Sequence, residues 1–455
     1  MKNLWALALG LILLTGCGGG IGNNGGEEAV TSVYEEAARQ FALDIIEERY
    51  AACIEVFTAD MKTALPEEAL KNAWIATAKD AGSFTGIEKT EVKQQAGYDT
   101  ITVYCAFENM GITIMPSYDA AGEVAGLYFN YYQPLAAALE LPEGLEEIAV
   151  TVGKGSDWEL DGKLTRRTDA PAKAAVVLVH GSGSTDMDET IYQNKPFRDI
   201  AWGLAAQGVD VLRYDKRTYT YGNTLIAAGI EKLTVSEETI DDAIAAARLL
   251  QDKGYERIYL AGHSLGGMLA FRIDQESGGM FAGLVLLAGS PRTLTDIVID
   301  QNAAVMAAMT DQEQIAETEA IVAEEQAKLA RLESMSAEEV LTDAAWLADT
   351  VFGMPAYYVK DLSRVDTAAL ARDYDKPVLV LQGGKDFQVY PDKDYVLWQE
   401  CLADNPEAEF VLYDNLNHLF MPVEGETTGT LQDYVMARTV APEVINDIAS
   451  FVLKQ

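Results

Sequence analysis

The sequence predicts an α/β protein whose parallel β-sheet is covered by helices on both faces, preceded by a small α+β domain. From residue 148 onward, short apolar strand patterns alternate with helical patterns, which is typical of such a sheet. Residues 28–133 instead place helical patterns ahead of a run of strand patterns. The chain has 455 residues, of which 49% are hydrophobic, so it can form two or three packed domains.

Residues 28–133 are predicted to form the α+β domain. Apolar residues recur at three- and four-residue spacing from Ala29 to Tyr50, and a second helix is expected from Pro66 to Asp80. Strand patterns then cover Lys89–Gln95, Tyr98–Phe107, Gly111–Tyr118 and Val124–Tyr132. Helices followed by strands in this order indicate an antiparallel sheet with helices packed on it.

Two features of this domain leave alternatives open. Cys53 and Cys105 are either a disulfide pair or two small buried apolar residues. A tyrosine cluster in the last strand is either core or one face of a ligand site; it comprises Tyr128, Tyr131 and Tyr132. Cys401 lies on a helical pattern and is expected in the core.

Residues 148–455 carry the alternating pattern, after a predicted linker at 134–147. Strands are expected at Ile148–Val152, Trp158–Arg167, Ala174–His180, Val209–Tyr214, Ile258–Gly262, Phe281–Leu287, Pro377–Gln382 and Phe410–Tyr413. Helices are expected at Pro196–Gln207, Glu237–Leu250 and Gly266–Ser277. Residues 293–365 interrupt the alternation with an Ala-, Glu- and Met-rich helical segment. They are predicted to form a cap over the C-terminal edge of the sheet, where ligands bind.

The N-terminus resembles a bacterial lipoprotein precursor. Residues 1–16 combine the basic Lys2 with an apolar run too short to span a bilayer, which is typical of a signal peptide. They lead into Leu14-Thr15-Gly16-Cys17, which is similar to a lipobox. The resemblance implies cleavage before Cys17 and attachment of lipid to its thiol, with residues 17–27 as a flexible tether. We expect an extracytoplasmic, membrane-anchored protein; an ordinary secretory signal is the alternative.

The charge balance limits the partners that the protein can have. Lys and Arg number 34 and Asp and Glu number 71, which gives a net charge of −37. A chain this acidic repels phosphate backbones, so nucleic acid is not expected as a partner. The three histidines and the cysteine spacing do not form a metal-binding pattern, so neither a metal nor a cofactor is expected.

The strongest chemical signal is Gly262-His263-Ser264-Leu265-Gly266, between a predicted strand and a predicted helix. That context is the one a nucleophile elbow requires. Glycines two positions on either side of Ser264 permit a sharp turn that exposes the serine hydroxyl. The backbone N–H of Leu265, at the helix N-terminus, is then able to donate to a developing oxyanion.

A serine nucleophile needs a general base, and the chain has only three histidines. His263 lies within the turn and is expected to point away from Ser264. His180 ends a strand before Gly181-Ser182-Gly183, a turn in which the N–H of Ser182 is the second predicted oxyanion donor. His418 remains as the base, in a loop that follows a strand.

The third member should be an acid that orients the base. Asp386 follows the strand Pro377–Gln382 and is the predicted acid, which gives the chain order Ser264, Asp386, His418. Asp392 and Asp394 lie nearby, but both fall where the next helix starts and are expected to cap it.

Together these motifs resemble the α/β-hydrolase family, in the branch of EstD-like carboxylesterases and serine aminopeptidase-like enzymes, with a cystatin/NTF2-like domain in front. The resemblance implies the α/β-hydrolase fold with an inserted helical cap. Relatives tend to carry Asp-Arg-Asp after the first turn, whereas this chain has Asp186-Met187-Asp188. The charged residues that end the next strand either reach the mouth of the site or form a structural ion-pair cluster; they are Arg213, Asp215, Lys216 and Arg217.

Three functions are compatible with these patterns. We expect a serine hydrolase that cleaves small carboxylic esters through an acyl-enzyme, without a metal or cofactor. A peptidase or amidase is the first alternative, in which Glu324 or Glu325 of the cap would hold a substrate amine. The other is a surface lipoprotein that binds a ligand without catalysis, which would require a broken triad.

Overall fold

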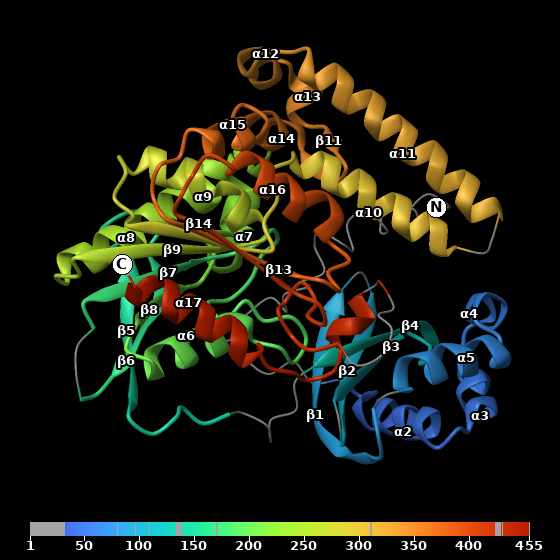
Figure 1. Ribbon diagram of the computed structural model, residues 1–455. Coiled ribbons are helices and arrows are strands. Elements are labelled where there is room, and N and C mark those ends of the chain that lie inside the picture. The colour runs from blue at the N-terminus through green and yellow to red at the C-terminus, as the bar shows by residue number, and fades with distance from the viewer. Residues whose placement is uncertain are drawn as a thin grey trace.

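The computed structural model describes residues 32–454 except 80, 96, 109, 133–138, 170–171, 310–311, 424–428 and 430. Residues 1–31 therefore lie outside the described part of the chain. They include the predicted signal peptide 1–16, Cys17 and the predicted tether 17–27. Figure 1 shows the small N-terminal domain beside a larger α/β domain, with the helices of residues 294–362 above the larger sheet. In the part of the chain described, no helix combines the length and the apolar character needed to cross a membrane.

The N-terminal domain packs short helices on one antiparallel sheet with strand order β1-β2-β3-β4. Its strands are β1 (Phe84–Gln95), β2 (Tyr98–Phe107), β3 (Gly111–Tyr118) and β4 (Val124–Tyr132), of which the last three match the predicted bounds. Its helices are α2 (Glu35–Ile46), α3 (Tyr50–Glu55), α4 (Ala59–Ala64) and α5 (Glu67–Ala78).

The continuous helix predicted to end at Tyr50 is wrong, because the chain turns between α2 and α3. Glu48 takes a φ of 60°, which ends α2. The turn lets Phe41 of α2 and Cys53 of α3 enter the same core. The apolar spacing continues through the break, so the sequence pattern did not reveal it.

The cysteines are core residues and not a disulfide. Cys53, Cys105 and Cys401 are free thiols, and all three side chains are buried. The disulfide alternative for Cys53 and Cys105 is therefore wrong. Burial raises the pKa of each of these two thiols to about 12, so both are protonated at neutral pH.

The larger domain is built on one eight-stranded sheet with order β14-β13-β10-β9-β7-β8-β6-β5. Its strands are β5 (Leu145–Val152), β6 (Leu160–Arg167), β7 (Ala174–Val179), β8 (Asp210–Tyr214), β9 (Arg257–His263), β10 (Gly283–Leu287), β13 (Val378–Gly383) and β14 (Ala408–Tyr413). The sheet is mixed and not wholly parallel, because β6 runs antiparallel to both β5 and β8. Residues 145–147, predicted to be linker, belong to β5.

Helices cover both faces of this sheet, as the pattern predicted. The central strand β7 is buried throughout, which explains its continuous apolar run. One face packs against α6 (Pro196–Ala206) and α17 (Pro442–Lys454). The other packs against α8 (Asp241–Asp252), α9 (Leu265–Glu276) and α16 (Val396–Cys401). In the larger domain, the sequence patterns did not predict α7 (Arg217–Ala228) or α15 (Thr367–Arg372).

A helical insertion, residues 294–362, separates the neighbouring parallel strands β10 and β13. It contains α10 (Leu294–Ala308), α11 (Gln312–Glu333), α12 (Ala337–Thr342), α13 (Ala344–Leu347) and α14 (Ala356–Leu362). A two-residue hairpin, β11 (Thr350–Val351) with β12 (Met354–Pro355), interrupts the helices. The insertion has a small core of its own, so it is a separate layer above the sheet.

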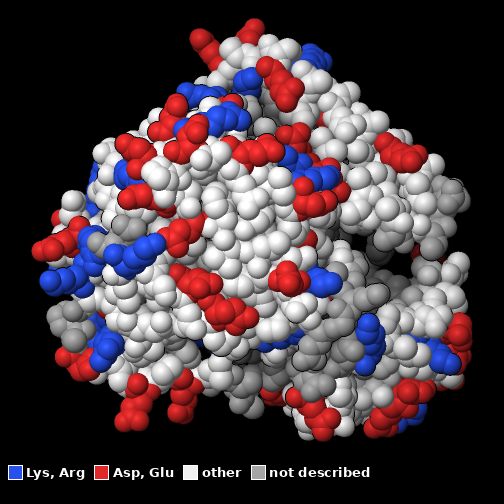
Figure 2. Space-filling model, in the orientation of Figure 1, with Lys and Arg blue, Asp and Glu red and all other residues white. Residues whose placement is uncertain are grey.

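Acidic side chains are scattered in groups over the face seen in Figure 2, and basic side chains lie next to many of them. Inside the larger domain, buried charges are paired. Arg213 of β8 is 1% exposed and donates to Asp188 at 2.8 Å and to Thr165 at 2.7 Å, and it also pairs with Glu147. Burial alone would raise the pKa of Glu147, but hydrogen bonds from Lys163, Trp202 and Arg213 lower it to about 2.

We expect Arg213→Met to destabilise the protein by about 3–5 kcal/mol, because Glu147 and Asp188 would keep their charges without this partner. Urea unfolding followed by tryptophan fluorescence measures the change. The control is Lys454→Met, which removes a surface ion pair with Glu409 and should change stability by less than about 1 kcal/mol. Equal losses in both variants would contradict the expectation.

Candidate active site

Ser264 stands on a sharp turn between β9 and α9. Its backbone has φ 51° and ψ −112°, and its N–H donates to the carbonyl of Leu287 at 2.8 Å. A Cβ atom at Gly262 would lie 2.2 Å from the carbonyl oxygen of Gly266, and one at Gly266 would lie 2.3 Å from that of Val179. Only glycine fits at either position, so this strained turn requires both of them.

Two predicted oxyanion donors lie beside Ser264. Leu265 is the first residue of α9, where the N–H has no acceptor within the helix. A Cβ atom at Gly181 would lie 3.2 Å from Cβ of Ser264, so the turn that carries Ser182 touches the serine. The N–H of Gly181 itself donates to Glu189 at 2.7 Å and is already used.

Asp386 and His418 form a buried acid–base pair. Nδ1 of His418 lies 2.7 Å from Oδ2 of Asp386, and the two residues are 3% and 5% exposed. The Asp386 carboxylate also accepts N–H bonds from Gln388 at 2.8 Å and Val389 at 2.9 Å. With Nδ1–H directed at the carboxylate, Nε2 of the neutral ring is left as the proton acceptor.

The loop that carries His418 reaches the Ser264 turn through His263. Nε2 of His263 donates to the carbonyl of His418 at 3.0 Å, and the two imidazole rings are 4.7 Å apart. Within the part of the chain described, neither the Ser264 hydroxyl nor Nε2 of His418 makes a hydrogen bond to another residue. The structure therefore joins His418 to Asp386 directly, and joins the loop of His418 to the Ser264 turn through His263.

Glu189 and His263 form a second buried pair that sequence reasoning missed. Nδ1 of His263 lies 2.9 Å from Oε2 of Glu189, which is an ion pair when the imidazole is protonated. Burial would lower the pKa of His263, but the Glu189 carboxylate outweighs it and raises this pKa above 6.5. Glu189 has a φ of 52°, and no periodic pattern signals such a residue.

The remaining histidine, His180, has a structural role. Burial lowers its pKa to about 4, so the ring is neutral at pH 7. Its Nε2 lies 3.1 Å from the carbonyl of Asp186, which fixes the loop after β7.

Asp392 and Asp394, the two other acidic residues near Asp386, make no hydrogen bond or ion pair with His418 in the described structure. Asp394 is fully buried and binds Arg292 and Ser290, at the start of the helical insertion. It also accepts the N–H of Tyr390 before the short helical turn Pro391–Tyr395, whereas Asp392 is exposed. Asp394 therefore fastens the insertion to the loop after β13.

The charged residues after β8 form structural ion pairs with separate carboxylates. Arg217 binds Asp242 at 2.6 Å, and Lys216 lies 3.1 Å from Glu238. Lys216 also donates to the carbonyl of Gly181 at 2.8 Å, so it supports the turn beside Ser264. Asp215 has a different partner, since it accepts the N–H of Met187.

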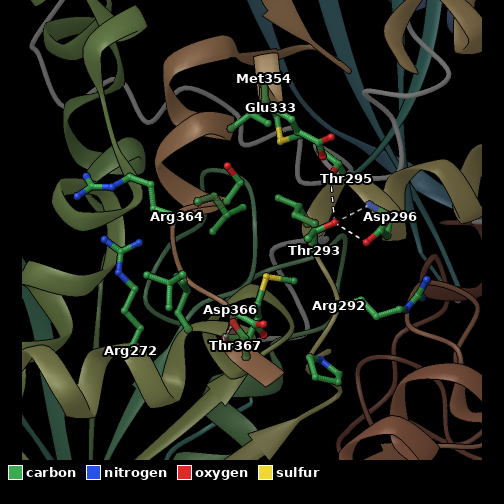
Figure 3. Close-up of a pocket in the computed structure, with 18 of the residues that line it drawn as sticks. Arg272, Arg292, Thr293, Thr295, Asp296, Glu333, Met354, Arg364, Asp366 and Thr367 are labelled. Carbon is green, nitrogen blue, oxygen red and sulfur yellow. Dashed lines mark hydrogen bonds between the residues drawn. The ribbon is translucent and has the colours of Figure 1, made fainter. Parts of the chain in front are cut away.

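A cavity of about 430 Å³ lies between α9 and the helical insertion. Figure 3 shows Arg272 and Arg364 on one side of it and Arg292 on another, with Glu333 and Met354 at a third. Its wall includes Met268, whose N–H donates to the carbonyl of Ser264 at 3.0 Å. The cavity below the insertion therefore reaches a residue that lies one helical turn from Ser264.

Residues 176–427 match the α/β hydrolase family, and residues 38–127 match a family described as a protein of unknown function, DUF3887. The chain is 32% identical over 436 residues to esterase EstD of Thermotoga maritima, covering 93% of this chain and 97% of the relative. The chain belongs to the α/β hydrolase family.

Two solved structures are similar to this chain at low sequence identity. The Pyrococcus furiosus esterase Pf2001 is 16% identical, with a TM-score of 0.42 over 71% of this chain and 97% of that one. Est1E from Butyrivibrio proteoclasticus is 14% identical, with a TM-score of 0.40 over 68% of this chain and 99% of that one.

We expect Glu189→Gln to lower the pKa of His263, because the variant removes the carboxylate that stabilises the imidazolium. A raised histidine pKa stabilises the fold below about pH 6.5, and that contribution is lost as pH rises through the folded-state pKa of His263. The stability difference between wild type and variant should therefore shrink at high pH. NMR titration of the three histidines, with unfolding at pH 6 and pH 9, measures both effects; an unchanged His263 pKa would contradict the ion pair.

Proposed function

We propose that this protein is a carboxylesterase-type serine hydrolase with Ser264 as nucleophile, His418 as general base and Asp386 as orienting acid. The observation that carries the proposal is the buried Asp386–His418 pair, whose loop is bonded to the residue next to Ser264. The similarity to a relative named as an esterase supports ester cleavage.

In this mechanism Ser264 attacks the ester carbonyl while Nε2 of His418 takes the hydroxyl proton. Asp386 stabilises the imidazolium that forms. The N–H groups of Leu265 and Ser182 receive the negative charge on the carbonyl oxygen. His418 then returns its proton to the leaving alcohol, which leaves an acyl-enzyme. His418 next takes a proton from a water molecule that attacks the acyl carbon, and returns it to Oγ of Ser264 as the carboxylic acid is released. The steps call on no cofactor.

The surroundings of Glu324 and Glu325 in the cap favour an esterase over a peptidase. Glu325 pairs with Lys328 at 2.9 Å and accepts the N–H of Phe352, so its charge already has partners within the insertion. Glu324 is exposed to solvent. Neither arrangement supports an anchor for a substrate amine. An intact acid–base pair likewise argues against a purely binding lipoprotein.

We expect Ser264→Ala to abolish labelling by a fluorophosphonate probe and to lower turnover of p-nitrophenyl acetate and butyrate by about 10⁴-fold or more. Asp386→Asn should lower kcat by about 10⁴-fold, because the base would lose its orientation and its charge partner. The control is Asp392→Asn, an exposed neighbour that should retain activity. Faster cleavage of amino-acid arylamides than of esters would favour a peptidase, and a folded wild type that takes no label would favour a binding protein.

We also propose that Cys17 carries a lipid anchor and that the enzyme is extracytoplasmic. The support is the lipobox-like sequence, since these residues lie outside the described structure. Two acyl chains on one cysteine are enough for stable membrane attachment.

Expression of the full-length chain in a bacterium with a radiolabelled fatty acid should label the wild type and place it in the membrane fraction. Cys17→Ser should remove both the label and the membrane attachment, whereas Cys401→Ser should change neither. A labelled Cys17→Ser chain would contradict the assignment.

A further inference from the structure

One segment of the larger domain, residues 431–438, belongs to the cores of both domains. Tyr434 is 1% exposed and packs in the core between the large sheet, α6 and α17. The next residue, Val435, is also 1% exposed but packs in the core of the N-terminal domain, with Met436 beside it. Adjacent residues thus enter two different cores, and Figure 1 shows this C-terminal segment next to the N-terminal sheet. The position of the segment depends on both domains.

Tyr434 connects this segment to the turn that holds the proposed catalytic acid. Its hydroxyl accepts a hydrogen bond from Nε2 of Gln388 at 2.6 Å, and its ring stacks on Phe387 with centroids 5.3 Å apart. The backbone N–H of Gln388 donates to Asp386 at 2.8 Å. A displacement of Tyr434 would therefore move a donor that fixes the Asp386 carboxylate.

A second loop, residues 186–194, joins the N-terminal domain to the other side of the site. Tyr192 meets the ring edge of Tyr131, on β4, at 5.5 Å between centroids. Three residues earlier, Glu189 binds the N–H of Gly181 and pairs with His263. The same loop contacts both the N-terminal domain and the turn beside Ser264.

The two loops are also bonded to each other. The Asn194 side chain, 1% exposed, donates to the carbonyl of Tyr434 at 2.5 Å and accepts the N–H of Arg438 at 2.8 Å. The loop 186–194 is strained, since Glu189 and Tyr192 both have φ near 52°. Such backbone persists only where surrounding contacts hold it in place. Some of those contacts come from the N-terminal domain.

We propose that the N-terminal domain is an internal brace for the active site, and that Tyr131, Tyr192 and Tyr434 are positioning residues for the acid turn and the oxyanion turn. The inference rests on the proposed function, because it assigns the acid role to Asp386 and the oxyanion turn to Gly181–Gly183. It gives the N-terminal domain a role in catalysis that requires no ligand of its own.

The test compares three variants in the N-terminal domain of the full chain. Tyr131→Ala removes the ring that touches Tyr192. Tyr131→Phe keeps that ring but loses the hydrogen bond from the hydroxyl to Thr77 within the domain. Tyr128→Ala is the matched control, since Tyr128 lies on the same strand and is 64% exposed. A fourth variant, Tyr434→Phe, removes only the hydroxyl that binds Gln388.

We expect Tyr131→Ala and Tyr434→Phe each to lower kcat for p-nitrophenyl butyrate by about three- to tenfold, with KM unchanged. Tyr131→Phe and Tyr128→Ala should keep wild-type kcat. Hydrogen exchange of a peptide covering residues 386–390 should be faster in the two impaired variants, because the N–H bonds to Asp386 loosen.

The proposal would be overturned if both Tyr131→Ala and Tyr434→Phe kept the wild-type kcat and the wild-type rate of hydrogen exchange. It would also be overturned if Tyr131→Ala and Tyr131→Phe lost kcat equally. The latter result would show an effect on domain stability alone. If the wild type hydrolyses no ester, the proposed function fails, while the exchange measurement still decides whether the N-terminal domain holds the turn after β13.

Discussion

The close approach of backbone segments around Ser264 is the constraint on which the rest of the site depends. Gly262, Gly266 and Gly267 lie so near to neighbouring backbone that a Cβ atom at any of them would come within 3.0 Å of another atom. This packing brings the end of β9, the start of α9 and the end of β7 to one point at the sheet edge. The loops after β7, β13 and β14 begin at the same edge, because β7, β9, β10, β13 and β14 all run parallel.

Two neighbouring parts of the molecule hold these loops in place, the helical insertion and the N-terminal domain. On the side of the helical insertion, Tyr358 of α14 donates to Glu238, which pairs with Lys216, and Lys216 donates to the carbonyl of Gly181. Arg292, before α10, binds the buried Asp394 in the loop after β13. The insertion is therefore linked, through Glu238 and Lys216, to the proposed oxyanion turn at Gly181, and Arg292 links it to the loop after β13.

On the side of the N-terminal domain, the contacts are mainly apolar and aromatic. Val435 enters the N-terminal core, and Tyr192 packs against Tyr131. Tyr434, next to Val435, binds Gln388 in the turn after β13, and Glu189, three residues before Tyr192, binds the N–H of Gly181. These two short segments thus connect the packing of the N-terminal domain to the turns around Asp386 and Ser264.

Local sequence patterns were enough to predict most strands of the large sheet and the triad candidates. Alternating apolar runs predicted β7, β9, β10 and β13 to within a few residues, because buried strands need continuous apolar side chains. The spacing of Gly262, Ser264 and Gly266 predicted the turn, since glycine is required wherever backbone approaches backbone. Asp386 and His418 followed from chain order and the small number of histidines. Such features are local, so a single stretch of residues reveals each of them.

The pairing of residues that are distant in the chain depended on tertiary packing. It separated Cys53 from Cys105 as two core thiols, broke the first helix at Glu48 and paired Glu189 with His263. It also placed Val435 in the core of a domain that ends some 300 positions earlier in the chain. No periodicity encodes these outcomes, because each depends on two segments that meet only once the sheets and helices have packed.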